Sequence, residues 1–139
     1  MRGNTFQADP DGGITLAASP DTPGRPVPWR WSVRIAPGSA ELAVKHDPTS
    51  VAVRRSEHRG EELPLERSGG ELLVAVPLQG RYLIGHASEP WHRWLESRDV
   101  AVLEGEDGES FLLQPATADA RLAVVRLTST TEQPLRWVP

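Results

Sequence analysis

Proline and glycine recur along the whole chain and divide it into segments that are too short for helices. The 139 residues include 13 prolines and 12 glycines, and these are not gathered in one linker. Turn sequences recur at 9–13 (DPDGG), 36–39 (APGS), 67–70 (RSGG), 77–80 (PLQG) and 104–108 (EGEDG). Such regular spacing indicates an antiparallel β sandwich or barrel rather than alternating strands and helices.

The segments between these turns have the composition and alternation of β-strands. In WRWSVRI, residues 29–35, apolar residues alternate with Arg30, Ser32 and Arg34, so that one face of the strand meets the core and the other meets solvent. Further strands are predicted at 14–18, 40–45, 50–55, 71–76, 81–86, 92–96, 99–104, 110–114 and 121–127. No segment has a convincing helical pattern.

Length and charge favour one domain with a small or neutral partner. A chain of this size fits a single domain over 1–139, with 1–13 as an N-terminal arm. We expect 128–139 to be a tail that docks on the body, because the apolar Trp137 lies close to its end. The net charge of −4 gives no electrostatic reason to bind nucleic acid or an anionic membrane.

The chain has no cysteine, which excludes disulfides, thiolate nucleophiles and thiolate metal sites. The first residues lack the apolar segment of a signal peptide, and runs such as LLVAV are too short to span a membrane. These features favour a soluble cytoplasmic protein.

Several motifs occur in an order that resembles one known family. GNT at 3–5, GGITLAASP at 12–20, WRWSVRIA at 29–36, PLQGRYLIG at 77–85 and the run from Leu95 to Leu127 are similar to the HutD/Ves family of the cupin (RmlC-like) superfamily. The corresponding residues are Asn4, Thr5, Trp29, Arg30, Ser32 and Asp99. The family's Gly-Pro-Phe-Ser…Phe-Pro-Gly stretch is replaced by APGSAELAVKHDPTS at 36–50. The resemblance implies an antiparallel cupin-like jelly-roll β-barrel, and a ligand-binding or accessory role in small-molecule metabolism.

The residues do not form a recognisable metal or catalytic motif. Metal-binding cupins resemble one another in a His-x-His pair, which places two imidazoles on one face of a strand, and this chain has no such pair. We therefore expect no metal and no cofactor. Two unusual ligand sets remain open if the fold brings their members together, one of His86, His92 and Glu89 and the other of His46, Asp47, Glu57 and His58. No Gly-x-Ser-x-Gly elbow and no phosphate-binding glycine loop occurs.

The segment GHASEPWHRW, residues 85–94, is the strongest candidate for a site because it combines two histidines, two tryptophans and charged residues. We predict a hairpin or rim connection between the strands at 81–86 and 92–96, with its turn at Glu89. Alternation would put Trp91 and Arg93 on one face, and His92 and Trp94 on the other. In one interpretation Trp94 fills the barrel while Trp91 and His86 cap its edge. In the other, Trp91, His92 or Trp94 lines the mouth of a ligand cavity.

Three functions are compatible with these features. The favoured one is a small-molecule-binding protein without a catalytic metal, whose ligand lies in the barrel interior against Trp29, Trp31, Tyr82, His92 and Trp94. The second is a metal-independent isomerase, cyclase or lyase, with His86 or His92 as general acid or base and Glu89 or Arg93 as partner. The third is a structural or regulatory homodimer that associates through its tail and an edge strand.

The charged segment 53–71 could also be taken for an anion site. Arg54, Arg55 and Arg59 lie close together in it, but glutamates are interleaved with the basic residues, namely Glu57, Glu61, Glu62 and Glu66. A solvated hairpin with compensating charges is therefore the preferred interpretation.

Overall fold

The computed structural model describes residues 7–8, 14–18, 31–35, 42–46 and 51–130, and all regular structure in these residues is β. The strands are β1 (Gln7–Ala8), β2 (Ile14–Ala18), β3 (Trp31–Ile35), β4 (Leu42–His46), β5 (Val51–Arg59), β6 (Leu63–Arg67), β7 (Leu72–Gln79), β8 (Tyr82–His86), β9 (His92–Leu95), β10 (Ala101–Leu103), β11 (Glu109–Pro115) and β12 (Arg121–Ser129). Every strand predicted from the sequence is confirmed in place, with ends that shift by a few residues. Strands β1 and β6 were not predicted.

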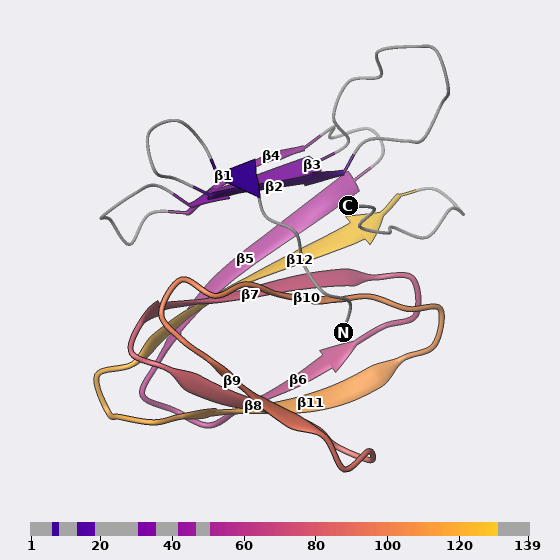
Figure 1. Ribbon diagram of the computed structural model, residues 1–139. Coiled ribbons are helices and arrows are strands. Elements are labelled where there is room, and N and C mark those ends of the chain that lie inside the picture. Colours follow the sequence, from indigo (N-terminus) through magenta and orange to yellow (C-terminus); the bar gives the residue numbers. More distant parts are fainter. Residues whose placement is uncertain (1–6, 9–13, 19–30, 36–41, 47–50, 131–139) are drawn as a thin grey trace.

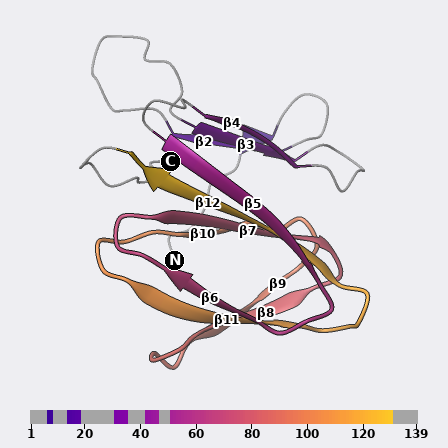
Figure 2. The same ribbon diagram turned by 180° about the vertical axis from the view of Figure 1, so that it is seen from behind.

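These strands form three antiparallel sheets, which lie one above another in Figures 1 and 2. The cover sheet has the order β1-β2-β3-β4, the central sheet β10-β7-β12-β5, and the far sheet β6-β11-β8-β9. Within the described part of the chain, no helix is long and apolar enough to cross a membrane.

The central and far sheets together make a jelly roll. From β5 to β12 the chain passes between the two sheets at each step, except at β8 and β9, which are hydrogen-bonded neighbours in the far sheet. This eight-strand order, with all pairings antiparallel, is the jelly-roll arrangement that cupins share with capsid and lectin domains. The predicted all-β, cupin-like jelly-roll fold is confirmed. The single-domain organisation with arm and tail remains a prediction, and residues 131–139 lie outside the described ranges.

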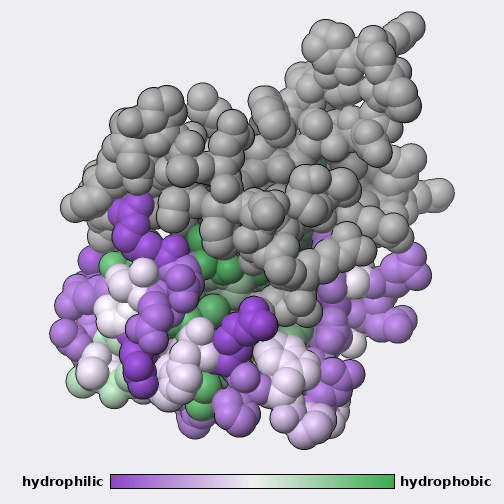
Figure 3. Space-filling view, in the orientation of Figure 1, coloured by the Kyte–Doolittle hydropathy of each residue, from purple (hydrophilic) through white to green (hydrophobic). Residues whose placement is uncertain are grey.

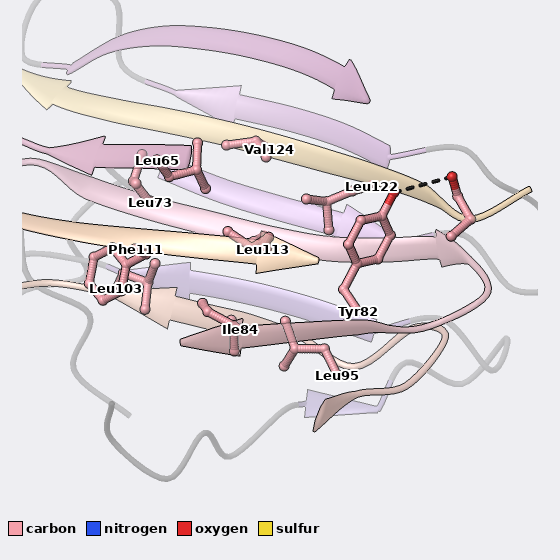
Figure 4. Packing of buried hydrophobic residues seen from close by; sticks show 13 residues of the cluster. Leu65, Leu73, Tyr82, Ile84, Leu95, Leu103, Phe111, Leu113, Leu122 and Val124 are labelled. Carbon is pink, nitrogen blue, oxygen red and sulfur yellow. Dashed lines mark hydrogen bonds between the residues drawn. The ribbon is translucent and has the colours of Figure 1, made fainter. Parts of the chain in front are cut away.

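An inner core fills the space between the central and far sheets. Its buried members come from alternate positions of the strands that face one another, and Figure 4 shows them closely packed. They are Leu65, Leu73, Ala75, Tyr82, Ile84, Leu95, Ala101, Leu103, Phe111, Leu113, Ala120, Leu122 and Val124. The Tyr82 hydroxyl donates a hydrogen bond to the Ala120 carbonyl oxygen at 3.1 Å, so the one polar atom of this side chain has a partner.

An outer core covers the opposite face of the central sheet. Leu72, Val74 and Val76 of β7 point into it, and Leu42 and Val44 of β4 pack against them from the cover sheet. Residues 72–77 of β7 are consequently buried one after another, without the alternation of a strand that has a solvent face. The continuous apolar run LLVAV is therefore explained by a sheet with a layer on each side.

The charged segment 53–71 is not a hairpin. Strand β5 belongs to the central sheet and β6 to the far sheet, so residues 60–62 connect two layers. The arginines do not form one patch either, because β5 alternates, so that Arg54 lies on one face and Arg55 and Arg59 on the other. On the side seen in Figure 3, hydrophilic residues cover most of the described surface, and hydrophobic residues show between them.

The two cores lead to a test of the three-layer arrangement. Leu72 and Leu73 are adjacent in β7 and fully buried in different cores. Replacing either one by Ala should lower the free energy of unfolding by about 2 to 5 kcal/mol in urea titrations. Leu112→Ala is a matched control, since this half-buried leucine of β11 points away from the inner core. A cost for Leu72→Ala of only about 0.5 kcal/mol, as at an exposed site, would show that the cover sheet does not bury the central sheet.

Candidate functional site

A chain of polar side chains crosses three neighbouring strands at one end of the inner core. Arg67 ends β6, Glu109 begins β11 and His86 ends β8, and the three strands are adjacent in the far sheet. Arg67 and Glu109 are directly paired across the ladder, and His86 is paired with Phe111, two positions along from Glu109. Because side chains alternate along strands, all three lie on the face that carries the inner core.

Arg67 is fully buried and ties two turns together. One guanidinium nitrogen, Nη1, donates to the carbonyl oxygens of Ser68, at 3.1 Å, and Gly105, at 2.9 Å. The other, Nη2, donates to the Asp107 carbonyl oxygen at 2.7 Å and to Glu109 Oε1 at 2.5 Å. The side chain is 0% exposed, and its Nε is a buried nitrogen without a hydrogen-bond partner. The guanidinium therefore holds the turns at 68–71 and 104–108 in one position.

The two turns can approach closely because Gly69 has no side chain. A Cβ atom at this position would lie 2.3 Å from the Glu106 carbonyl oxygen, well inside contact distance. The backbone amide of Gly70 also donates to the Gly105 carbonyl oxygen at 2.8 Å. The predicted turns at 67–70 and 104–108 are thus packed against each other above Arg67.

Glu109 links the arginine to the histidine. Its Oε1 accepts from Arg67, and its Oε2 lies 2.9 Å from Nε2 of His86. Burial raises the pKa of the Glu109 carboxyl, but hydrogen bonds and positive charge from Arg67 and His86 outweigh it and hold the pKa below its usual value. The side chain is 33% exposed, so an ionised carboxylate reaches the surface at this end of the barrel.

The hydrogen bonds of His86 define its tautomer. Nδ1 lies 3.1 Å from the backbone nitrogens of both Ser88 and Glu89, and these amides can only donate. Nδ1 must therefore be the unprotonated nitrogen, and Nε2 carries the proton that is donated to Glu109. The Ser88 hydroxyl lies 3.3 Å from the same Nδ1. Both ring nitrogens are engaged, and the imidazole side chain is only 7% exposed.

Aromatic rings surround this imidazole. The His86 ring meets Phe111 edge-on at a centroid distance of 5.3 Å and lies tilted against Trp91 at 5.8 Å. Trp91 and Phe111 are 6.2 Å apart. The Trp91 indole nitrogen donates to Glu89 Oε2 at 3.1 Å, which fixes the ring to the turn. We call Arg67, Glu109, His86, Trp91 and Phe111 the end cluster.

The predicted connection at 85–94 is confirmed as the hairpin between β8 and β9, with Gly85 paired to His92. His86 and Trp91 cap the end of the inner core, as one of the two interpretations required. Glu89, a candidate partner for a catalytic histidine, instead accepts from Trp91, and the carboxylate beside His86 is that of Glu109.

Trp94 does not fill the barrel. Its partner Leu83 points away from the inner core, between the buried Tyr82 and Ile84, and Trp94 is 44% exposed on this outer face. The Arg81 guanidinium carbon lies 4.0 Å above the centre of its ring. His92 is exposed and paired with Gly85, again on the outer face. The short strand β9 forms the edge of the far sheet, and its first three side chains are exposed while Leu95 is buried in the inner core.

The remaining predicted ligand-binding residues do not join the end cluster. Tyr82 is buried in the inner core, with its hydroxyl engaged by Ala120. Trp29 lies outside the described residues, and of Trp31 the structure describes the backbone in β3, where it pairs with His46. A role for any of the five in ligand binding stays a prediction. Among the described residues, no three His, Asp or Glu side chains are grouped so that they could hold a metal ion.

Comparisons with known proteins concern the fold alone. No protein-family model matches the sequence, and no curated protein matches it. Among solved structures, a de novo designed double-stranded β-helix has 11% identity and a TM-score of 0.44, over 55% of this chain and 97% of that one. A cupin protein from Bacteroides fragilis has 16% identity and a TM-score of 0.42, over 66% and 74% of the two chains. The cupin domain of Schizosaccharomyces pombe Cnp3 has 9% identity and a TM-score of 0.41, over 91% and 64%. It is the strand order described above that identifies the jelly roll.

Sequence reasoning missed Arg67 and Glu109, although a signal was present. In LPLER, Leu63, Leu65 and Arg67 alternate with Pro64 and Glu66, so the arginine occupies an inward position. In ESFLLQP the same alternation places Glu109 in line with Phe111 and Leu113. Opposite charges at inward positions of two strands predict a buried pair, but only once the two strands are known to be neighbours.

We expect Arg67 to be essential for stability. Arg67→Met keeps an unbranched side chain but removes all donors, so that the Asp107 carbonyl oxygen loses the guanidinium as its donor, and Gly105 and Glu109 each lose one of two partners. Loss of one partner of a buried pair should lower the free energy of unfolding by about 3 kcal/mol, measured by chemical denaturation. Arg81→Met is the matched control, since Arg81 is exposed above Trp94 and should cost at most about 1 kcal/mol. Equal costs would contradict the role of Arg67 as a clamp.

Glu109 should make stability depend on pH under acidic conditions. Its pKa is lower in the folded protein than in the unfolded chain, so the unfolded state binds more protons as the pH falls. The stabilisation is complete above the ordinary glutamate value of about 4.3 and is lost as the pH falls through the lower folded value. Glu109→Gln should be less stable at pH 7, because every neighbour of this carboxylate is a donor, and its unfolding free energy should vary less with pH below about 5.

A second acid with a lowered pKa separates this effect from general acid denaturation. Hydrogen bonds from Thr117 and Gln79 lower the pKa of Asp119, so Asp119→Asn should remove a different part of the same pH dependence. A Glu109→Gln variant whose pH profile is identical to that of the wild type would show that Glu109 is not ionised within the network.

Proposed function

We propose that this chain is a small-molecule-binding jelly-roll protein whose ligand binds at the end cluster, with Glu109 and Trp91 as its main contacts. The role we propose is accessory or regulatory, of the kind that the resemblance to HutD/Ves proteins implies, and without a catalytic metal. The observation that carries the proposal is a carboxylate held in its ionised form, one-third exposed, beside a group of three aromatic rings.

The surroundings of Glu109 support a binding role rather than a purely structural one. An ionised carboxylate has about four lone-pair positions, and Arg67 and His86 use two of them. The remaining positions can accept hydrogen bonds from a ligand without disturbing the buried network. Ligand sites usually combine apolar and aromatic walls with a few fixed polar groups, and the end cluster has this composition.

This chemistry restricts the ligand. An ionised Glu109 can only accept further hydrogen bonds. A matching ligand therefore carries N–H or O–H donors, as amines, amides and hydroxylated compounds do. The Trp91 ring, which is partly buried, offers contact area to an apolar or aromatic body. The ligand should therefore combine a donor group with a small apolar part.

The location differs from the barrel-interior site expected from the sequence. The space between the central and far sheets holds a set of buried apolar residues, Tyr82 among them. Binding at the end of the barrel requires no rearrangement of that core. Contributions from Trp29 and Trp31 remain proposals.

A metal-independent enzyme is the second candidate, favoured by the contact between His86 and Glu109. An imidazole oriented by a carboxylate is a frequent general base. Here, however, Nε2 of His86 is bonded to Glu109, and Nδ1 accepts from the amides of Ser88 and Glu89. Nδ1 could therefore take a proton from a substrate only after the turn at 88–89 had opened. Binding without turnover agrees better with this geometry. Self-association through the tail 128–139 and an edge strand stays a prediction.

A thermal-shift screen tests the proposed function. The purified chain would be screened against amines, amino-acid derivatives, hydroxylated organic acids and aromatic metabolites, with divalent metals included. A ligand that binds only the folded state adds about 2.7 kcal/mol at 100 times its dissociation constant. Compounds with donor groups should raise the melting temperature of the wild type, while Trp91→Ala and Glu109→Gln should show a strongly reduced shift.

Trp94→Ala supplies the matched control, because this tryptophan lies in the same hairpin but on the outer face of the far sheet. It should bind as the wild type does. If Trp94→Ala loses binding and Trp91→Ala retains it, the ligand lies on the outer face and the proposal is wrong. Shifts with divalent metals alone would contradict the metal-free proposal.

A further inference from the structure

The turn between β8 and β9 depends on one unprotonated nitrogen. His86 Nδ1 accepts from the amides of Ser88 and Glu89, each at 3.1 Å, and no other acceptor is found for these two amides among the described residues. The ends of the turn are held differently. The amide of Ala87 donates to the Ser110 carbonyl oxygen, and the amide of His86 donates to the Trp91 carbonyl oxygen. The imidazole thus fixes only the middle of the turn.

A proton on Nδ1 would remove these hydrogen bonds. A protonated imidazole has a donor at each nitrogen, so Nδ1 would direct an N–H at two amides that are also donors. The Ser88 hydroxyl, 3.3 Å away, could rotate and accept from it, but it could not take the place of the acceptor for the amides. The ring itself would stay in position, because Nε2 donates to the Glu109 carboxylate in either state.

The groups that face His86 decide how this balance changes with pH. Glu109 on β11 is ionised and attracts the proton, and its charge is shared with the buried Arg67 of β6. From the turn, Glu89 is occupied by the Trp91 indole N–H. Phe111 and Trp91, the rings packed against the imidazole, carry no charge. A proton on Nδ1, with Glu109 still ionised, therefore strengthens the contact with Glu109 and removes the contacts with the turn.

We propose that residues 88–90 form a proton-operated gate at the end cluster. Neutral His86 holds the gate closed, with Trp91 fixed to Glu89. Protonation of His86 at Nδ1 releases the amides of Ser88 and Glu89 and frees Trp91 from its fixed position. That release of Trp91, a proposed ligand contact, changes the affinity for a ligand rests on the function proposed above, while the release of the turn does not.

Amide hydrogen exchange tests the gate without any ligand. Exchange of the Ser88 and Glu89 amides would be measured by NMR between pH 8 and pH 5, relative to the intrinsic rate at each pH. Protection should fall by at least about tenfold on acidification, equivalent to about 1.4 kcal/mol, while the Ala87 amide, bonded to Ser110, stays protected. The chemical shifts of the two amides should change together with those of the His86 ring.

Two variants give the controls. His86→Phe keeps an aromatic ring against Phe111 but has no acceptor, so the Ser88 and Glu89 amides should be unprotected at every pH. His92→Ala removes an exposed histidine of the same hairpin and should leave the pH response unchanged. If the His86→Phe variant does not fold, the joint titration of ring and amides in the wild type decides alone. Protection of these amides that does not change with pH in the wild type would overturn the gate.

Ligand binding at two pH values separates the gate from the proposed function. A ligand found in the screen should bind Trp94→Ala and the wild type with affinities that change with pH to the same extent, and His86→Phe should lose that change. If the Ser88 and Glu89 amides lose protection on acidification but no compound in the screen binds, the gate is supported and the proposed function is not. If a ligand binds equally at pH 8 and pH 5 and the turn is not released, the proposed function is supported and the gate is wrong.

Discussion

Burial of the central sheet on both faces is the constraint that organises this molecule. Successive residues of β7 enter different cores, Leu73 and Ala75 on one side and Leu72, Val74 and Val76 on the other. A jelly roll of two layers would leave the second set in water as a contiguous exposed apolar surface. The cover sheet removes that surface through Leu42 and Val44. The short N-terminal strands are therefore part of what stabilises the barrel.

Among the described residues, the far sheet buries one of its faces in the inner core, and its strict alternation creates the end cluster. Inward positions of β6, β11 and β8 carry apolar residues along most of their length and then, at the same end, Arg67, Glu109 and His86. A buried guanidinium is costly unless its donors are satisfied, and this one has acceptors in two turns as well as in Glu109. The apolar core and the polar end therefore come from the same alternation of side chains along each strand. The inward residues are apolar except at one end of the sheet, where they are polar.

The sequence predicts most of this fold because the strands that alternate, or that are apolar throughout, are easily found between turn signals. It does not predict which strands are neighbours. Strand β6 was missed because LPLER is short and lies in a highly charged segment, and without it the pairing of Arg67 with Glu109 could not be inferred. Trp94 was assigned to the interior because alternation gives two faces but not which one is inside. Trp91 and His86 were placed at the barrel end because the turn at Glu89 fixes the hairpin, and with it their positions.

Each group in the end cluster has a fixed role as hydrogen-bond donor or acceptor, and the chemistry of the cluster follows from these roles. Arg67 can only donate, so Glu109 must accept. Glu109 is acceptor-only when ionised, so His86 must donate from Nε2, and its Nδ1 is then free to accept from the turn. A proton added to the carboxylate or to the imidazole places a donor opposite a donor. When Glu109 is ionised and His86 is neutral, the Glu109 carboxylate has unused acceptor positions at the surface. A ligand with donor groups can fill them without reversing any bond in the chain, whereas a ligand with only acceptors cannot. One arrangement of donors and acceptors therefore accounts for the sensitivity of the turn to protons and for the class of ligand that the cluster would select.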